Sequence, residues 1–112
     1  MGRALLGELE HLILLAIVRR GRDAYGAAII DEIETQTERE LAHAAVYIAL
    51  QRLEAKGLIA SRTVSGTTER GGRAKARFVV TPPGRARLRA SASALFTMWQ
   101  GVDRALRQRG RS

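Results

Sequence analysis

Hydrophobic residues recur at helical spacing in four separate segments of the chain. In the first segment they form one stripe, made of Leu6, Leu9, Ile13 and Ile17. This spacing is typical of an amphipathic helix, and Gly21 follows as a stop signal. The same periodicity appears three more times. The predicted helices cover about residues 6–20, 26–37, 44–56 and 83–107.

The first predicted helix is apolar on more than one side. Three further leucines, at positions 12, 14 and 15, lie off its stripe. A helix that is apolar on several sides must be buried by more than one neighbour. We therefore expect several elements to pack around it.

Two short apolar runs between the third and fourth helices predict a β-hairpin. The runs LIASRTV (58–64) and ARFVV (76–80) are separated by a polar stretch that contains Gly71 and Gly72. Residues 81–83, Thr-Pro-Pro, then predict a helix start. A threonine hydroxyl can cap the first turn, where the missing N–H of proline has no cost.

The order of these elements predicts a mainly α protein with a small β-hairpin. Three helices followed by a hairpin form a winged helix-turn-helix, whose third helix enters the major groove of DNA. The loop of the hairpin, called the wing, then lies along the sugar-phosphate backbone. We expect residues 1–81 to form the DNA-binding domain and residues 82–112 to form a C-terminal dimerisation helix and a basic tail.

Positive charge is concentrated in the second half of the chain. The formal net charge is +8, with −2 in residues 1–60 and +10 in residues 61–112. A basic surface on a near-neutral body indicates a polyanionic partner, most often nucleic acid. Because 17 of the 19 basic residues are arginine, compositional bias is an alternative explanation for part of the excess. The predicted acidic face of the second helix would be turned away from DNA.

The candidate DNA contacts fall into two groups. In the wing, Gly71 and Gly72 allow a close approach to the duplex, and four basic residues can neutralise phosphates: Arg70, Arg73, Lys75 and Arg77. On the outer face of the third helix, the candidates are Tyr47, Ile48, Gln51 and Arg52. Packing at the helix edge is the alternative for Tyr47, and ordinary solvation is the alternative for Gln51 and Arg52.

Six residues of the last predicted helix are spaced 4, 3, 4, 3 and 4 apart. They are Leu88, Ala92, Leu95, Trp99, Val102 and Leu106. This series, named the seam, has the heptad spacing of helices that pack against each other. Burial against the chain's own core is one explanation. The regularity of the seam at the end of the chain favours a second helix as its partner, and so a homodimer.

Four segments resemble the PadR family of transcriptional regulators: LGELEHLILLAI, AYGAAIIDEIE, AVYIALQRLEAKGLI and RGGRAKARFVVTPPGRARL. The resemblance covers about residues 6–90. Its most specific parts are Ala24-Tyr25-Gly26 and the pattern Val46-Tyr47-x-x-Leu50-x-x-Leu53-Glu54. The single C-terminal helix is similar to that of the smaller PadR subfamily. The resemblance implies a dimeric, ligand-responsive repressor whose last helix exchanges with the partner's first helix.

The resemblance also implies a flat hydrophobic effector at the centre of the dimer. Trp99 lies on the seam and Phe96 is close to it in the sequence, so these two residues are the candidate ligand contacts. A stacked aromatic compound would suit two symmetry-related indoles. The alternative is that Trp99 only fills the interface.

The chain departs from the family pattern where the third helix begins. The family often has serine or proline, then glycine and threonine; this chain has Ala42, His43, Ala44 and Ala45. The helix thereby loses a hydroxyl cap worth about 1 kcal/mol. Ile48 also replaces a residue that is usually proline or polar. These differences are consistent with weak or relaxed sequence specificity.

Other function classes find little support in the sequence. The absence of cysteine excludes disulfides and thiolate metal sites. The longest apolar run, residues 12–18, is shorter than the ~20 residues of a membrane span, and we expect a cytoplasmic protein. His11 and His43 lack an acidic partner at catalytic spacing and are expected to be surface residues. We expect no enzyme, cofactor or metal site.

The alternatives to a regulator are a winged-helix protein-interaction module and a non-specific nucleic-acid binder.

Overall fold

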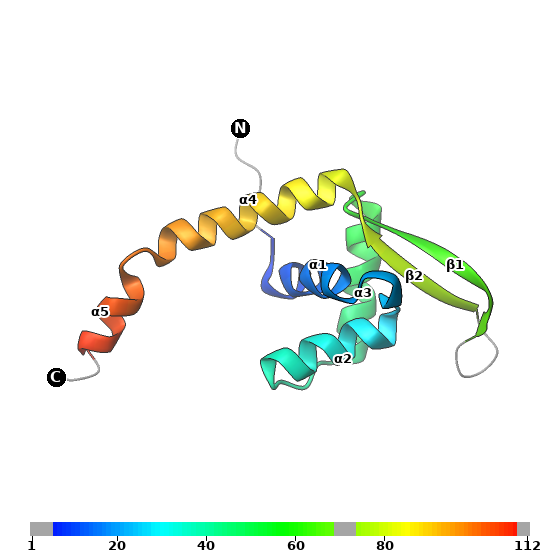
Figure 1. Cartoon of the computed structure of the whole chain (residues 1–112), viewed down its shortest axis with the longest axis horizontal. Coiled ribbons are helices and arrows are strands. Elements are labelled where there is room, and N and C mark those ends of the chain that lie inside the picture. Colours follow the sequence, from blue (N-terminus) through cyan, green and yellow to red (C-terminus); the bar gives the residue numbers. More distant parts are fainter. Residues whose placement is uncertain (1–5, 69–73, 110–112) are drawn as a thin grey trace.

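The structure, a computed structural model, describes residues 6–68 and 74–109. Its helices are α1 (Glu8–Arg20), a short 3-10 turn η1 (Gly21–Asp23), α2 (Gly26–Thr37), α3 (His43–Ala55), α4 (Pro82–Trp99) and α5 (Val102–Arg109). Its strands are β1 (Ile59–Thr68) and β2 (Ala74–Val80), which form an antiparallel hairpin. The predicted fold class, mainly α with a small hairpin, is confirmed. Figure 1 shows the hairpin projecting from one end of the helical body and α4 leaving in the opposite direction.

Helix α1 lies at the centre of the body. It contacts α2, α3, β2 and α4, and Ile13, Leu14 and Ile17 are almost fully buried among them. The prediction that this helix has several neighbours is therefore confirmed. Leu15 and Val18 stay 39% and 58% exposed, so most, but not all, of the apolar surface of α1 is buried within its own chain.

The hairpin is longer than the sequence predicts. Paired residues run from Ile59 opposite Val80 to Thr63 opposite Ala76, and the pairing resumes with Thr68 opposite Ala74. The register shift between these two regions puts extra residues into β1, and such bulges bend a hairpin and increase its twist. The other edge of β2 is covered too, because the Phe78 N–H donates to the Ala24 carbonyl at 2.9 Å.

A set of close contacts fixes the start of α4. The Thr81 hydroxyl accepts a hydrogen bond from the Gly84 N–H at 3.1 Å, as predicted for the cap, and donates to the Gly57 carbonyl at 2.6 Å. Gly84 approaches Leu58, the residue before β1, so closely that a Cβ atom there would lie 2.0 Å from the Leu58 carbonyl oxygen. The first turn of α4 is therefore held firmly against the hairpin.

The prediction of one last helix running to residue 107 is wrong. Helix α4 ends at Trp99, and α5 begins at Val102 after a bend. Gly101 has a φ of +80°, a left-handed conformation that glycine adopts without cost and that ends a helix. The seam spacing extends across this glycine, which is why the pattern alone suggested a continuous helix.

The molecule is elongated because its C-terminal helices leave the body. The Cα radius of gyration is 16.6 Å and the principal extents are 58 × 35 × 21 Å. A compact domain of this length has a radius of gyration of about 13 Å. Figure 1 shows the end of α4 and all of α5 reaching away from the other elements.

His11 is not the surface residue that the sequence suggested. Its ring is half-buried between α1 and α4, and Nδ1 lies 3.0 Å from the hydroxyl oxygen of Ser91. Ser91 is only 2% exposed, so this polar contact satisfies a buried group and links the two helices. His43 is exposed, as expected.

Candidate nucleic-acid interface

Helix α3 presents one buried face and one open face. Val46, Ala49, Leu50 and Leu53 pack into the core. The predicted groove-facing residues all lie on the uncovered side: Tyr47, Ile48, Gln51 and Arg52. Tyr47 is 44% exposed and Ile48 is 49% exposed, so a large apolar and polar surface is available there.

The beginning of α3 lacks a side-chain cap, as predicted. Ala42 occupies the N-cap position and makes no capping hydrogen bond. His43 follows, with Nε2 3.9 Å from a carboxylate oxygen of Glu34. Ala44 and Ala45 are exposed. Neither has a hydrogen-bonding side chain, so these two positions can contact a base only through their methyl groups or their backbone.

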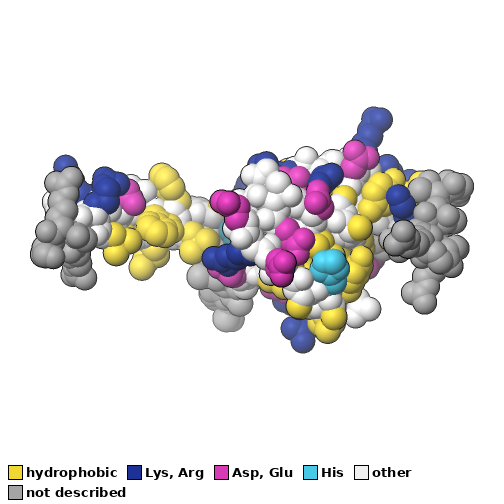
Figure 2. All heavy atoms as spheres, turned by 90° about the horizontal axis from the view of Figure 1, so that it is seen from below, with side chains coloured by type: hydrophobic (Ala, Val, Ile, Leu, Met, Phe, Trp, Pro, Cys, Tyr) yellow, Lys and Arg dark blue, Asp and Glu magenta, His cyan; other side chains and the backbone are white. Residues whose placement is uncertain are grey.

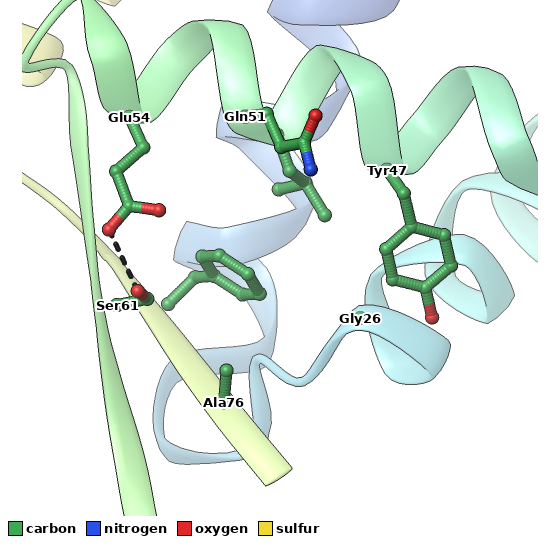
Figure 3. A pocket seen from close by; sticks show the side chains of 8 residues that line it. Gly26, Tyr47, Gln51, Glu54, Ser61 and Ala76 are labelled. Carbon is green, nitrogen blue, oxygen red and sulfur yellow. Dashed lines mark hydrogen bonds between the residues drawn. The ribbon is translucent and has the colours of Figure 1, made fainter.

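The two most specific motifs of the sequence meet in space. The ring of Tyr47 covers Gly26 at the start of α2, where a Cβ atom would lie 2.8 Å from Cε1 and 2.9 Å from the hydroxyl oxygen of the tyrosine. Figure 3 shows the Tyr47 ring pointing towards Gly26. Packing at the helix edge is thus part of what Tyr47 does, although its ring remains partly open to solvent.

A shallow hollow of about 300 Å³ separates α3 from the hairpin. Tyr47, Gln51 and Glu54 line its α3 side, and Ser61, Ala76 and Phe78 are on the hairpin side. Glu54 accepts a hydrogen bond from the Ser61 hydroxyl at 2.8 Å. This bond joins the end of α3 to β1 (Figure 3).

The structure describes two of the four basic residues predicted for the wing, Lys75 and Arg77. They do not form one row of side chains that faces the phosphates. The Lys75 ammonium lies 4.9 Å from the centroid of the Tyr25 ring, a cation–π contact that steadies the side chain. Arg77 alternates with Ala76 and Phe78, which face α3, so it belongs to the opposite face of the hairpin. Arg70 and Arg73 lie outside the described residues.

The acidic face of α2 is partly neutralised by α1. Arg19 donates to Glu32 at 2.7 Å, and Arg20 donates to Asp31 at 2.8 Å. The hydrogen bond from Arg19, together with the charges of Arg19 and Arg20, lowers the pKa of Glu32. Figure 2 shows acidic side chains gathered over the middle of the body.

The predicted seam residues have two different environments. Leu88 packs against the core, whereas the other five are exposed: Ala92, Leu95, Trp99, Val102 and Leu106. Phe96 and Met98, beside them, are 70% and 75% exposed. Figure 2 shows hydrophobic side chains collected along the projecting tail. An uncovered apolar surface of this kind marks an interaction site.

Comparison with protein families decides the class of this molecule. Residues 14–90 match the transcriptional regulator PadR-like family. The chain belongs to this family. It is therefore a DNA-binding transcriptional regulator and not an enzyme.

Solved PadR-like structures share this fold. A PadR-like regulator from Bacillus cereus superposes with a TM-score of 0.71 at 18% identity, covering 88% of this chain and 90% of the other. A PadR family regulator from Clostridium difficile has 27% identity and a TM-score of 0.61, covering 91% and 97%. No curated protein sequence gave a significant match.

A further similar fold comes from Bordetella bronchiseptica. Its BpsR protein, whose DNA binding is regulated by 6-hydroxynicotinic acid, has 16% identity and a TM-score of 0.63, covering 98% of this chain and 83% of its own. The winged-helix architecture is thus shared from the first helix to the C-terminal segment.

Sequence reasoning missed one residue that lines the hollow beside α3. Glu54 lines the hollow beside α3, with Gln51 three residues and Tyr47 seven residues before it. This helical spacing from two chosen candidates could have revealed it. Its carboxylate places negative charge at the end of α3, beside the hollow.

The described parts of the chain offer neither a metal site nor a membrane span. Among residues 6–68 and 74–109, no group of three or more His, Asp or Glu residues could hold a metal ion. No helix in these two ranges is long and apolar enough to cross a membrane.

Proposed function

We propose that this PadR-like regulator is a repressor that binds an operator as a homodimer. One observation carries the proposal: α4 and α5 expose a series of large apolar side chains that no described element of the same chain covers. A two-fold pair would bury this surface on both copies. In this proposal residues 1–81 bind DNA, and residues 82–112 supply the dimerisation segment and the basic tail.

Dimerisation would set the spacing of the two α3 helices. A symmetric regulator of this type reads two half-sites about 34–36 Å apart. In each half-site, Tyr47, Gln51 and Arg52 would contact base edges. On the wing, Arg70, Arg73 and Lys75 would bind phosphates.

The DNA-binding proposal is tested by selecting bound fragments from random or genomic DNA. A palindromic motif with that half-site spacing supports both the operator and the dimer. Recovery of unrelated fragments would instead identify a non-specific binder. Non-specific binding is a serious alternative, because the exposed side chains of Ala44 and Ala45 cannot form hydrogen bonds to bases.

Single substitutions separate the roles of the wing and of α3. Arg73→Ala and Lys75→Ala should weaken binding to every sequence and reduce the slope of log affinity against log salt by about 0.9 each. Gln51→Ala or Arg52→Ala should reduce the difference in binding free energy between operator and random DNA by about 1–3 kcal/mol. Wing variants that bind like the parent at every salt concentration would contradict the wing assignment.

We further propose that a flat hydrophobic ligand binds where the two Trp99 side chains meet, with Phe96 beside them. The exposed indole supports this proposal, as does the small aromatic regulator of the similar BpsR fold. Such a ligand changes DNA binding only if it binds one spacing of the α3 helices more tightly than the other.

Fluorescence tests the ligand site directly, because Trp99 is the only tryptophan. Planar aromatic dyes should quench its emission and release operator DNA, and Trp99→Ala should abolish the release. If no such compound acts, and Trp99→Ala still dimerises and binds operator normally, Trp99 only fills the interface.

A further inference from the structure

Two arginines face each other across the hairpin. Arg62 on β1 is the direct partner of Arg77 on β2. Like charges in directly opposite positions of a sheet destabilise it. The pair lies on the face turned away from α3, because the residues alternating with it, Ser61 and Phe78, line the hollow beside α3. An anion bound here would relieve the repulsion.

More cations gather where this face meets the helical body. An open hollow of about 460 Å³ is lined by Arg22 of η1, Arg77 of β2 and Arg85 of α4. A neighbouring hollow of about 320 Å³ on the hairpin shares Arg77 with it and adds Arg62. The two hollows therefore form one continuous surface, named the back surface.

The arginines of the back surface are free of carboxylates in the part of the chain that the structure describes. None of Arg22, Arg62, Arg77 and Arg85 has an ion pair with a described acidic residue. Arg19, Arg20, Arg39 and Arg107 each do. Positive charge is thus left available on this side of the molecule.

The back surface also has an apolar part. Val18 and Val79 line the larger hollow and are 58% and 51% exposed. Phosphates and sugars of DNA would leave these side chains in water, whereas a hydrocarbon chain would cover them and gain about 25 cal/mol for each Å² removed from water. Few polar groups around an apolar floor are typical of small-molecule sites.

We propose that the back surface binds an amphiphilic organic carboxylate. The carboxylate lies among the guanidinium groups, which can hold it through paired hydrogen bonds, and the hydrocarbon part covers Val18 and Val79. The site joins α1, η1, β2 and α4, so an occupant contacts both the hairpin and the first turn of the helix that leads to the seam. It is separate from Trp99.

The test is calorimetric titration of the full-length protein with octanoate. Octanoate should bind. Octanol lacks the carboxylate and inorganic phosphate lacks the hydrocarbon chain, so each should bind at least tenfold more weakly. Arg22→Gln and Arg85→Gln should each lower octanoate affinity about tenfold. The matched control is Arg89→Gln, an exposed arginine of α4 outside both hollows, and its affinity should equal that of the parent.

Three outcomes would overturn the proposal. The first is that octanoate fails to bind the parent, or binds Arg22→Gln and Arg85→Gln as well as the parent. The second is that the two variants lose affinity for duplex DNA with a flatter salt slope and without any octanoate binding, which would make this surface a DNA contact. The third is that Trp99→Ala removes octanoate binding while the arginine variants keep it, which would place the ligand on the exposed tail. Far-UV circular dichroism verifies that each variant is folded.

Discussion

The two ends of α4 have opposite environments. Thr81 caps its start against the hairpin, Gly84 in the first turn is buried, and Ser91 in the middle of the helix is buried too. Beyond Leu95, the side chains of the same helix and of α5 are open to solvent. The heptad spacing is the same along both parts. The difference teaches that periodicity identifies an apolar face but does not identify what covers it.

The largest expected effect comes from placing charge on the uncovered end. Leu95→Glu combined with Val102→Glu should weaken self-association a thousandfold or more, or about 4 kcal/mol, because four carboxylates would have to be buried in each dimer. Analytical ultracentrifugation measures the change. A control with the same added charge, Ser93→Glu with Gln108→Glu, lies off the seam. If the seam variant still forms the dimer of the parent, the exposed end of α4 is not the dimer interface, and the contrast between its two ends is wrong.

A single methyl group tests the covered end. Gly84→Ala should destabilise the fold by about 3 kcal/mol, the upper range for overpacking, since its Cβ would overlap the Leu58 carbonyl at 2.0 Å. Neither backbone can yield without moving α4 away from the hairpin. Denaturant unfolding measures the loss. A variant as stable as the parent would show that the start of α4 is not held where the structure places it.

Loss of the cap should cost less. Thr81→Ala removes the acceptor for the Gly84 N–H and the donor to Gly57, and should lower stability by about 1 kcal/mol. Thr81→Ser retains the hydroxyl and should retain most of the stability. Thermal unfolding of the three proteins compares them directly. Equal losses for alanine and serine would assign the effect to the threonine methyl group.

The glycine at the uncovered end should respond differently from Gly84. No atom of the described residues lies within 4 Å of a Cβ built on Gly101, but its φ of +80° disfavours alanine. Because α5 has little packing to hold the bend, Gly101→Ala should let α4 and α5 join into one helix, with a change in global stability below about 0.5 kcal/mol. Far-UV circular dichroism should report more helix. A stability loss as large as that of Gly84→Ala would mean that α5 is held in place.

The smallest effect concerns an ion pair of the body, between Arg19 of α1 and Glu32 of α2. The pKa of Glu32 is lowered in the folded protein, first by the hydrogen bond from Arg19. A lowered pKa stabilises the fold above the unfolded value, about 4.3, and this stabilisation is lost as pH falls through the folded value. The melting temperature of the parent should therefore exceed that of Glu32→Gln at neutral pH, and the difference should shrink as the pH falls below the unfolded value. A difference that is independent of pH would contradict this.

The sequence predicted most of the winged-helix body because its signals are local. Apolar periodicity located α1, α2 and α3 to within two residues at each end, and the Thr-Pro-Pro run located the start of α4. The open face of α3 followed from the same periodicity. Contacts between distant residues were not visible in this way. The cover of Gly26 by Tyr47 and the contact of His11 with Ser91 depend on how helices cross.

The sequence also did not show on which face of the hairpin each basic residue lies. Four basic residues counted along the wing looked like one phosphate-binding group. The register of β1 and β2 set Arg77 opposite Arg62, on the face away from α3, and η1 and α4 brought Arg22 and Arg85 to the same place. Charge composition cannot give this arrangement, because a strand sends alternate side chains to opposite faces.

The sequence by itself determined the class of fold, the order of the elements and the family of the regulator. These follow from hydrophobic periods, glycine and proline signals and short motifs, all of which act over a few residues. Only the tertiary structure decided that α4 stops at Trp99, that the seam is covered at Leu88 and exposed beyond it, and that four arginines share the back surface. The physical reason is that burial and charge pairing depend on which neighbours the folded chain supplies, and local spacing does not specify those neighbours.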